Sequence, residues 1–228
     1  MDSTIHKCRT CRTSMCRFRA ENRRVIKRHF NTIISAKVGL YYATTSPQVT
    51  SAHKHYFFYQ LDIIGFTKEA AGIIHDEFSK RGVISEPIEV DASSTLNSFR
   101  DFSALLVGTP TWNTGAEEMR SGTTWDNILE EVRSENLLGK KVAVFGCGDS
   151  ISYGDYFCDA IEEIHSAFAK SGAMMVGKVD TTGYDFIHSK SVQDGYFLGL
   201  ALDQVNEGHL TEERVRSWCS QLIKEGVE

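Results

Sequence analysis

The 228-residue sequence lacks several features that would place it in a special class of protein. It has no run of eighteen or more apolar residues, which excludes an ordinary membrane-spanning helix. It has only three prolines, no low-complexity tract and no internal repeat, which excludes a collagen-like rod and wholesale disorder. With 41% hydrophobic and 24% charged residues, the chain has the composition of a globular protein that can bury a sizeable core.

The sequence also lacks the common nucleotide and metal signatures. Neither G-x-x-x-x-G-K-[ST] nor G-x-G-x-x-G occurs, so a nucleoside triphosphate and a Rossmann dinucleotide are disfavoured. Cys8 and Cys11 form a C-x-x-C, but no second pair completes a zinc set, and among the histidines only His53 and His55 have metal-ligand spacing. We therefore expect no metal site. The body has an odd number of cysteines, which favours a reducing compartment over a disulfide scaffold.

Charge is distributed unevenly along the chain. Residues 1–36 carry nine basic and two acidic side chains, whereas the remainder carries 16 basic and 28 acidic ones. The acidic remainder of the chain should repel nucleic acid and attract basic protein surfaces. The Arg-rich, acid-poor segment 1–36 is typical of an organelle transit peptide, and a disordered basic tail or a mispredicted start codon are the alternatives. We expect this extension to precede a single domain over 37–228.

Short apolar runs alternate with amphipathic stretches in this domain. The patterns predict strands at 36–43, 84–90, 104–108, 141–146, 174–179 and 196–202, and helices at 68–81, 125–132, 155–170 and 211–224. Nearly continuous hydrophobic strands separated by helices indicate a parallel sheet covered on both faces. Because such sheets bind ligands beyond the carboxyl ends of their strands, the loops that follow the strands form the candidate site.

Three of these loops suit a planar, phosphorylated ligand. Hydroxyls after the first strand, together with the free N–H groups at the start of the first helix, can bind a phosphate, although such residues also simply cap helices. Trp112 follows the third strand and Tyr153 the fourth, where two glycines allow the backbone to approach a ligand. A ligand with a phosphate on the first loop and a planar ring between Trp112 and Tyr153 is a mononucleotide. The alternative is that Trp112 folds back and packs against the protein.

Four motifs in a fixed order resemble the long-chain flavodoxins: KVGLYYATTS with GFTKEAAGII, LLVGTPTWNTGA, VAVFGCGDSISYGDYFCDA, and VGKVDTTGYDFIHSKSVQDGYFLGLALDQVNE. The last resembles the insertion that interrupts the fifth strand of that type. The resemblance covers residues 36–226. It implies a flavodoxin-like α/β fold, with a doubly wound five-stranded parallel sheet of order 2-1-3-4-5 and helices on both faces, and it implies non-covalently bound FMN.

The resemblance also implies the residues that contact FMN. The residues expected to contact the phosphate are Thr44, Thr45, Ser46, Gly65, Phe66 and Thr67. Those expected to contact the isoalloxazine ring are Thr111, Trp112, Asn113, Thr114, Gly115, Cys147, Gly148, Asp149 and Tyr153. Asp159 and Asp203 approach the ribityl chain or the rim of the site.

One segment departs from the family pattern. Flavodoxins run directly from the Thr/Ser cluster into the glycine of the phosphate loop, whereas here residues 47–64 intervene. The aromatic cluster Tyr56–Tyr59 within this insertion suits a partner-binding loop. A translated intron is the alternative, since the codons for Gln48-Val49 can hold a splice donor, although excision would remove only residues 49–60. Sequencing of the transcript decides between them.

The resemblance implies a low-potential one-electron carrier that passes electrons between redox proteins and is not an enzyme. We expect a monomer whose partners are basic-faced redox proteins, namely photosystem I and ferredoxin–NADP reductase if the extension directs the chain to the chloroplast stroma. Otherwise the chain is cytoplasmic. The alternatives are an FMN-dependent NAD(P)H:quinone oxidoreductase and a degenerate binding module without flavin. Neither nucleic acid nor a membrane span is expected.

Overall fold

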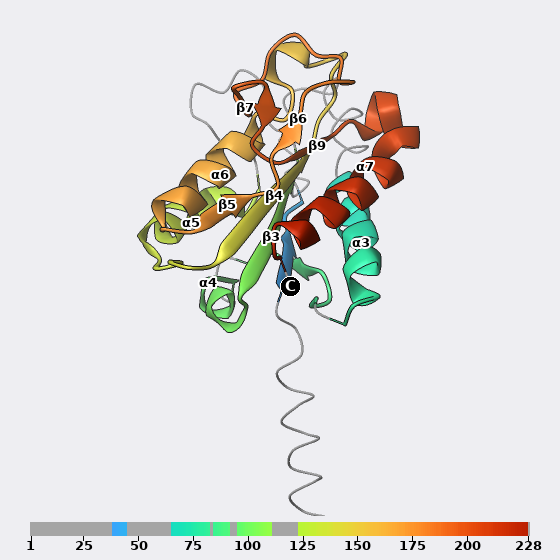
Figure 1. Ribbon diagram of the computed structural model, residues 1–228. Coiled ribbons are helices and arrows are strands. Elements are labelled where there is room, and N and C mark those ends of the chain that lie inside the picture. Colours follow the sequence, from blue (N-terminus) through green and yellow to red (C-terminus); the bar gives the residue numbers. More distant parts are fainter. Residues whose placement is uncertain (1–37, 45–64, 83, 92–94, 111–122, 228) are drawn as a thin grey trace, which may run out of the picture. The chain divides into compact units, whose positions relative to one another are not determined.

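The computed structural model describes residues 38–44, 65–82, 84–91, 95–110 and 123–227, drawn as coloured ribbon in Figure 1. The proposed division of the chain at residue 36 and the insertion at 47–64 lie outside these ranges, so both remain predictions. Among the described residues, every strand expected from the hydrophobic pattern is present, with adjusted ends. The following elements place the candidate site.

A parallel sheet forms the centre of the domain. Its strands are β2 (Ile88–Glu89), β1 (Val38–Tyr42), β3 (Ala104–Pro110) and β4 (Lys141–Cys147), and β4 is followed at the edge by β5 (Met174–Val176). The spatial order β2-β1-β3-β4-β5 confirms the predicted order 2-1-3-4-5. The predicted strand at 84–90 is shorter than expected, because only Ile88–Glu89 forms a ladder and Ile84 makes an isolated bridge to Val38.

The fifth position of the sheet is shared by two strands, as the sequence predicts. β5 pairs with the first half of β4, and β9 (Leu200–Leu202) pairs with its second half, both in parallel. The intervening segment contains a small antiparallel sheet of order β6-β8-β7. Its strands are β6 (Val179–Asp180), β7 (Val192–Gln193) and β8 (Tyr196–Phe197). Residues 177–199 therefore interrupt a single sheet position.

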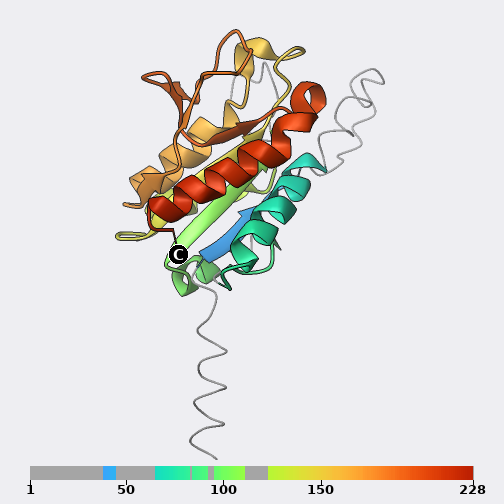
Figure 2. The ribbon, with the colours of Figure 1, turned by 45° about the vertical axis from the view of Figure 1, so that its right-hand side comes forward.

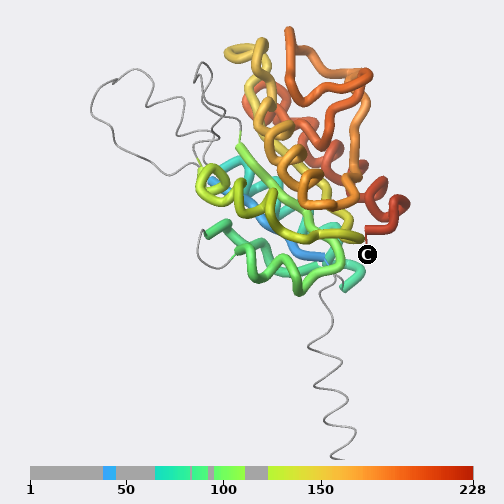
Figure 3. The backbone as a smooth tube through the Cα atoms, turned by 90° about the vertical axis from the view of Figure 1, so that its left-hand side faces the viewer, coloured from blue at the N-terminus to red at the C-terminus, as the bar shows by residue number. Residues whose placement is uncertain are grey.

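Helices cover both faces of the sheet. α3 (Phe66–Ser79) and α7 (Gln204–Lys224) lie side by side on one face, as Figures 1 and 2 show. α5 (Trp125–Ser134) and α6 (Ala160–Lys170) cover the other face, which is turned toward the viewer in Figure 3. The short α4 (Thr95–Ser98) and a 3-10 turn at Phe99–Asp101 precede β3. This arrangement leaves the loops after the strands to form the candidate site.

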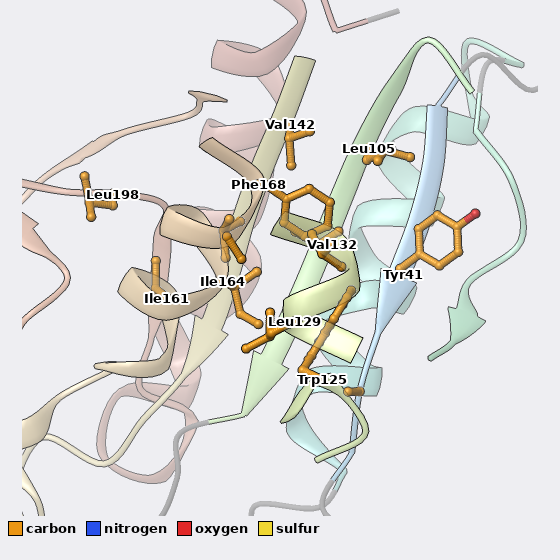
Figure 4. Close-up of a cluster of buried hydrophobic side chains, with 14 of the residues drawn as sticks. Tyr41, Leu105, Trp125, Leu129, Val132, Val142, Ile161, Ile164, Phe168 and Leu198 are labelled. Carbon is orange, nitrogen blue, oxygen red and sulfur yellow. The ribbon is translucent and has the colours of Figure 1, made fainter. Parts of the chain in front are cut away.

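Alternating side chains divide the core into two halves, because successive residues of a strand point to opposite faces. Tyr41, Leu105 and Val142 pack with the apolar faces of α5 and α6, as Figure 4 shows. Val38, Leu40 and Leu106 pack with α3 and α7 instead. Since both faces are buried, the strands read as continuous hydrophobic runs and not as alternating ones.

Two helices begin at positions other than the predicted ones. α6 begins at Ala160, five residues later than expected, because residues Gly154–Tyr156 form a 3-10 turn and Cys158 has a positive φ of 53°. α7 begins at Gln204, seven residues earlier than expected. The side chain of Asp203 caps this earlier start, and a non-helical residue at Glu207 separates the first turn from the remainder of the helix.

Candidate functional site

The carboxyl ends of three strands meet at one edge of the sheet. Tyr42 of β1 pairs with Gly108 of β3, and Pro110 at the end of β3 pairs with Cys147 at the end of β4. The segments that leave these strands therefore start from neighbouring positions. The described parts of the predicted site at this edge are Thr44, the start of α3, and the segment that follows β4.

Thr44 already has a hydrogen-bond partner within the chain. Its Oγ1 donates to Glu89 Oε1 over 2.6 Å, which links the end of β1 to β2. Thr45 and Ser46 lie outside the described residues. The role of all three in holding a phosphate stays a prediction, and in this structure the Thr44 hydroxyl serves a neighbouring carboxylate.

The start of α3 has donors for which the described residues supply no side-chain acceptor. Gly65 occupies the N-cap position and makes no side-chain cap hydrogen bond. The early N–H groups of a helix have no acceptor within the helix itself, and they carry its positive dipole end. Thr67, in the same turn, is fully buried, and its Oγ1 has no hydrogen-bond partner among the described residues. Phe66 lies between these two residues and is half-buried.

The thiol of Cys147 lies near the Thr67 hydroxyl without the geometry of a hydrogen bond. Burial raises the pKa of Cys147 to about 12, and the Thr67 side chain acts in the opposite direction. Cys147 is therefore a neutral, fully packed thiol at neutral pH. It forms part of the wall beside Thr67, and its predicted contact with the ligand is not a matter of thiolate chemistry.

The glycines at the end of β4 and directly after it, Gly146 and Gly148, have a packing reason that sequence reasoning did not identify. A Cβ atom on Gly146 would lie 2.6 Å from Ile161 Cγ1, and one on Gly148 would lie 2.8 Å from the sulfur of Cys158. The backbone N–H of Gly148 donates to the carbonyl of Leu202 over 2.8 Å. These glycines allow close packing against Ile161 and Cys158, which is a reason for glycine at these positions other than approach to a ligand.

Asp149 shapes the turn that follows Gly148. Its Oδ1 accepts from the backbone N–H groups of Ile151 at 3.1 Å and Ser152 at 2.8 Å, and its carbonyl accepts from Tyr153 N at 3.0 Å. Burial alone would raise the pKa of Asp149, but hydrogen bonds from Ser152, Asn206 and Ile151 outweigh it, so the pKa is lowered. Asp149 is thus an ionised acceptor that fixes the position of the half-buried Tyr153.

The predicted aromatic pair cannot be assembled from the described residues. Tyr153 lies at the start of the 3-10 turn at Gly154–Tyr156, close to the carboxyl edge of the sheet. Trp112, together with Thr111, Asn113, Thr114 and Gly115, lies outside the described ranges. The stacking of a ligand ring between Trp112 and Tyr153 therefore remains a prediction.

The two remaining candidates accept hydrogen bonds from the chain itself. Asp159 Oδ1 accepts from Lys190 N at 2.7 Å, and burial raises the pKa of Asp159 against the effect of that bond. Asp203 is 1% exposed and accepts from Ser150 N at 3.0 Å and Asn206 N at 2.9 Å. Both carboxylates hold loop backbone in place, and their contact with a ribityl chain stays a prediction.

Sequence reasoning missed Asn206. Its Nδ2 donates to Asp149 Oδ1 and to both oxygens of Asp203, at 2.9 to 3.1 Å. Asp is a favoured N-cap residue, so the bond from Asn206 N to the Asp203 side chain has a local signal in the sequence. The contact with Asp149, 57 residues away in sequence, leaves no local signal.

No group of side chains in the described ranges could hold a metal ion. The cysteines in those ranges, Cys147, Cys158 and Cys219, are buried free thiols. No helix among the described residues is both long and apolar enough to cross a membrane.

Comparison with known proteins assigns the chain to a family. The flavodoxin family model matches residues 63–218. A flavodoxin of Nostoc sp. is 36% identical over 192 residues, which cover 84% of this chain and 98% of the relative, and that of Synechococcus elongatus is 34% identical over 190 residues, covering 83% and 98%.

A solved structure of similar fold contains a ligand. The flavodoxin of Fusobacterium nucleatum bound to flavin mononucleotide matches with a TM-score of 0.64 and 26% identity, over 82% of this chain and 97% of that one. The sheet order, the interrupted fifth strand and the sequence matches agree with one another. The protein belongs to the flavodoxin family.

Proposed function

We propose that this chain is a low-potential one-electron carrier that binds FMN non-covalently at the carboxyl edge of its sheet. Membership of the flavodoxin family carries the electron-transfer role, which is that of a carrier and not of an enzyme. The observation within the chain that supports FMN is the start of α3. There, a fully buried hydroxyl without a described partner lies in the same turn as N–H groups that no described side chain caps.

The described residues fit a phosphorylated ligand. A phosphate accepts hydrogen bonds strongly, and a helix start supplies N–H donors together with a favourable dipole. The Thr67 hydroxyl adds a donor that is costly to bury without an acceptor. We assign the phosphate to Gly65, Phe66 and Thr67, with Thr44, Thr45 and Ser46 completing the site.

The segment after β4 forms the second part of the proposed site. Gly148 and Asp149 hold the turn, and Tyr153 offers an aromatic face on which a planar ring can stack. Thr111 to Gly115, including Trp112, would supply the opposite face. FMN when bound supplies one-electron redox chemistry, and the protein sets its potential through burial, stacking and nearby charge.

The charges of the site support a low potential. Asp149, Asp155 and Asp159 lie within the twelve residues that follow β4, and Asp149 is ionised and buried. Negative groups beside a buried ring disfavour the uptake of a further negative charge. The last one-electron reduction should therefore require a strong reductant.

The partners in this proposal are redox proteins with a basic face. The chain beyond residue 36 carries a large excess of acidic side chains, which steers basic surfaces toward it at low ionic strength. Photosystem I and ferredoxin–NADP reductase are the specific partners if residues 1–36 are a chloroplast transit peptide. Import of a fluorescent fusion of these residues into isolated chloroplasts, followed by cleavage, tests that location.

Titration of the purified full chain with FMN tests the proposal. We expect quenching of flavin fluorescence with a stoichiometry of one, followed by transfer of electrons from reduced ferredoxin–NADP reductase to cytochrome c. Rapid NAD(P)H-dependent quinone turnover would support the quinone oxidoreductase instead. A chain that neither binds FMN nor shows turnover would support the binding module without flavin.

A further inference from the structure

An amide group lies between two buried carboxylates at the carboxyl edge of the sheet. Asn206 Nδ2 is 2.9 Å from Asp149 Oδ1 and 2.9 Å from Asp203 Oδ2. Asp149 is 3% exposed and Asp203 is 1% exposed. Buried like charges repel each other strongly, so this arrangement needs donors between them. The side-chain NH₂ of Asn206 supplies such donors to both carboxylates.

The two carboxylates hold the same loop at successive residues. Asp203 Oδ2 accepts from Ser150 N at 3.0 Å, while Asp149 Oδ1 accepts from Ile151 N and Ser152 N. Three consecutive backbone N–H groups ahead of Tyr153 are thereby fixed. Because Asp149 belongs to the loop and Asp203 to the start of α7, Asn206 joins the loop to the helix that follows β9.

The placement of Asn206 depends on the break in α7. Glu207 has non-helical dihedral angles (φ −123°, ψ 29°), so the turn that contains Asn206 is separated from the long part of the helix. Glu207 is held by an ion pair with Arg214 at 2.6 Å, and its N–H donates to the Asp203 carbonyl. The Asp203 cap therefore sets the direction of the Asn206 side chain more than the axis of α7 does.

We propose that Asn206 is a positioning residue of the FMN site, which holds Asp149 against Asp203 and so fixes the loop that presents Tyr153. This inference rests on the proposed function, because it assigns a role at the same site. Asn206 acts through the loop and needs no contact with the flavin. Preorganisation of this kind raises affinity by reducing the ordering that binding requires.

Two variants of Asn206 and one control test the proposal. Asn206→Ala removes the donors, and Asn206→Asp replaces them with a third carboxylate of the same shape. Gln221→Ala is the control, since Gln221 is also an amide on α7 that holds loop backbone, through Lys178 O at 2.8 Å, but lies far along the helix. Each variant is titrated with FMN at pH 8 and pH 5.5, and its unfolding is measured without FMN.

We expect Asn206→Ala to raise the Kd for FMN about tenfold at both pH values, the size of one lost charge-assisted hydrogen bond. Asn206→Asp should raise it further at pH 8 and recover toward the wild-type value at pH 5.5, where a shared proton again provides a donor between the carboxylates. The nearby thiols of Cys147 and Cys158 stay neutral over this range, because burial raises the pKa of both. Gln221→Ala should leave the Kd unchanged.

Three outcomes would overturn the inference. An Asn206→Asp protein with the wild-type Kd at both pH values would show that the amide does not position the loop. A Gln221→Ala protein that weakens FMN binding as much as Asn206→Ala, at equal loss of stability, would show a general effect of α7. If the wild-type chain itself does not bind FMN, the proposed function fails and this inference fails with it. If the wild-type chain binds FMN but the variants behave in either of the first two ways, only the role of Asn206 fails.

Discussion

The start of α3 and the loop after β4 lie at the same edge of the sheet, but they differ in how their polar groups are hydrogen-bonded. In the loop, Asp149 accepts from Ile151 N and Ser152 N, and Asp203 accepts from Ser150 N. At the start of α3, the buried Thr67 hydroxyl has no described partner, and no side chain in the described ranges caps the first turn. The loop is held by hydrogen bonds within the described chain, whereas the start of α3 has donors for which the described residues supply no acceptor.

This difference suggests how the two regions divide the work of binding. A loop that closes its own hydrogen bonds before a ligand arrives loses little freedom on binding. An unsatisfied donor set gives its full interaction only when an anion is present. We expect mutations in the loop to reduce stability first, and mutations at the start of α3 to reduce affinity first.

The largest effect should come from removing the acceptor in the loop. Asp149→Ala leaves the N–H groups of Ile151 and Ser152 and the amide of Asn206 without their partner, so the free energy of unfolding at pH 7 should fall by about 3 kcal/mol. Urea denaturation measures this. The control is Asp180→Ala, which removes a similar turn acceptor for Thr182 N in an exposed turn, and its loss should be smaller.

The same variant has a predicted pH dependence. Because the pKa of Asp149 is lowered in the folded state, its stabilisation is present above the pKa of the unfolded chain and is lost as pH falls through the folded value. The gap between wild type and Asp149→Ala should therefore be widest at neutral pH and should narrow in acid. A gap that is constant from pH 7 down to acid would contradict the role given to the ionised carboxylate.

The next effect separates affinity from stability. Thr67→Val keeps the shape of the side chain but removes the buried hydroxyl, so FMN affinity should fall by roughly 10- to 100-fold. The chain without FMN should become more stable by about 1 kcal/mol, because an unsatisfied hydroxyl is no longer buried. Fluorescence titration and thermal unfolding measure the two quantities.

Thr211→Val is the matched control for Thr67→Val. Thr211 is also buried with a hydroxyl that has no described partner, but it lies within α7. It should gain similar stability and keep the wild-type affinity. If both variants lose affinity equally, the hydroxyl of Thr67 has no special role.

A smaller effect is expected at Glu163, a buried carboxyl group on α6 that we do not place in the candidate site. Glu163 on α6 is 9% exposed and its Oε2 has no described partner; burial, and then the charge of Asp126, raise its pKa to about 7. Because the pKa of Glu163 is raised in the folded state, the contribution of this side chain to stability is fully present below its pKa in the unfolded chain. That contribution is lost as pH rises through its pKa in the folded chain.

Glu163→Gln should therefore be more stable than wild type at pH 8, by about 1 to 2 kcal/mol, and the difference should shrink toward pH 5. FMN affinity should not change. Urea denaturation at the two pH values measures the difference, and Glu131→Gln, on the exposed face of α5, gives the effect of losing a charge alone. A wild-type chain that is relatively more stable at pH 8 would reverse the predicted sign.

The smallest effect concerns the segment that interrupts the fifth strand. The Tyr184 hydroxyl donates to Ala201 O at 3.0 Å, and its ring packs between Phe197 and the guanidinium of Arg214. Tyr184→Phe keeps these ring contacts, so stability should fall by only about 0.5 to 1 kcal/mol. Hydrogen exchange should show faster opening of residues 177–199, while exchange at the start of α3 stays as in wild type.

The architecture could be predicted from the sequence because its signals are local and repeated. The hydrophobic runs at 104–108 and 141–146 became β3 and β4 with small extensions, and the polar tract between 176 and 200 indicated an interrupted strand. The starts of α6 and α7 were predicted less well. Cys158 has a positive φ, which its residue type does not predict, and the apolar pattern at 211–224 does not show the additional first turn that Asp203 caps.

The sequence predicts the residue types of the candidate site, and that prediction stays untested, but it does not predict how the described residues are connected. Hydroxyls, glycines and acidic residues after the strands pointed to the carboxyl edge of the sheet, where the described ones lie. The bond of Asn206 to Asp149 joins positions 57 residues apart, and the steric need for Gly148 arises from Phe157 and Cys158. Such contacts depend on how two elements pack, so they could not be derived before the fold was known.

Comparison of FMN with riboflavin, which lacks the phosphate, tests most directly whether the start of α3 holds the phosphate of FMN. Titration of the wild-type chain and of Thr67→Val with both flavins gives four dissociation constants. We predict that the wild type binds FMN at least about a hundredfold more tightly than riboflavin, and that Thr67→Val reduces this ratio. Equal affinity of the wild type for the two flavins, or an unchanged ratio in Thr67→Val, would contradict the account.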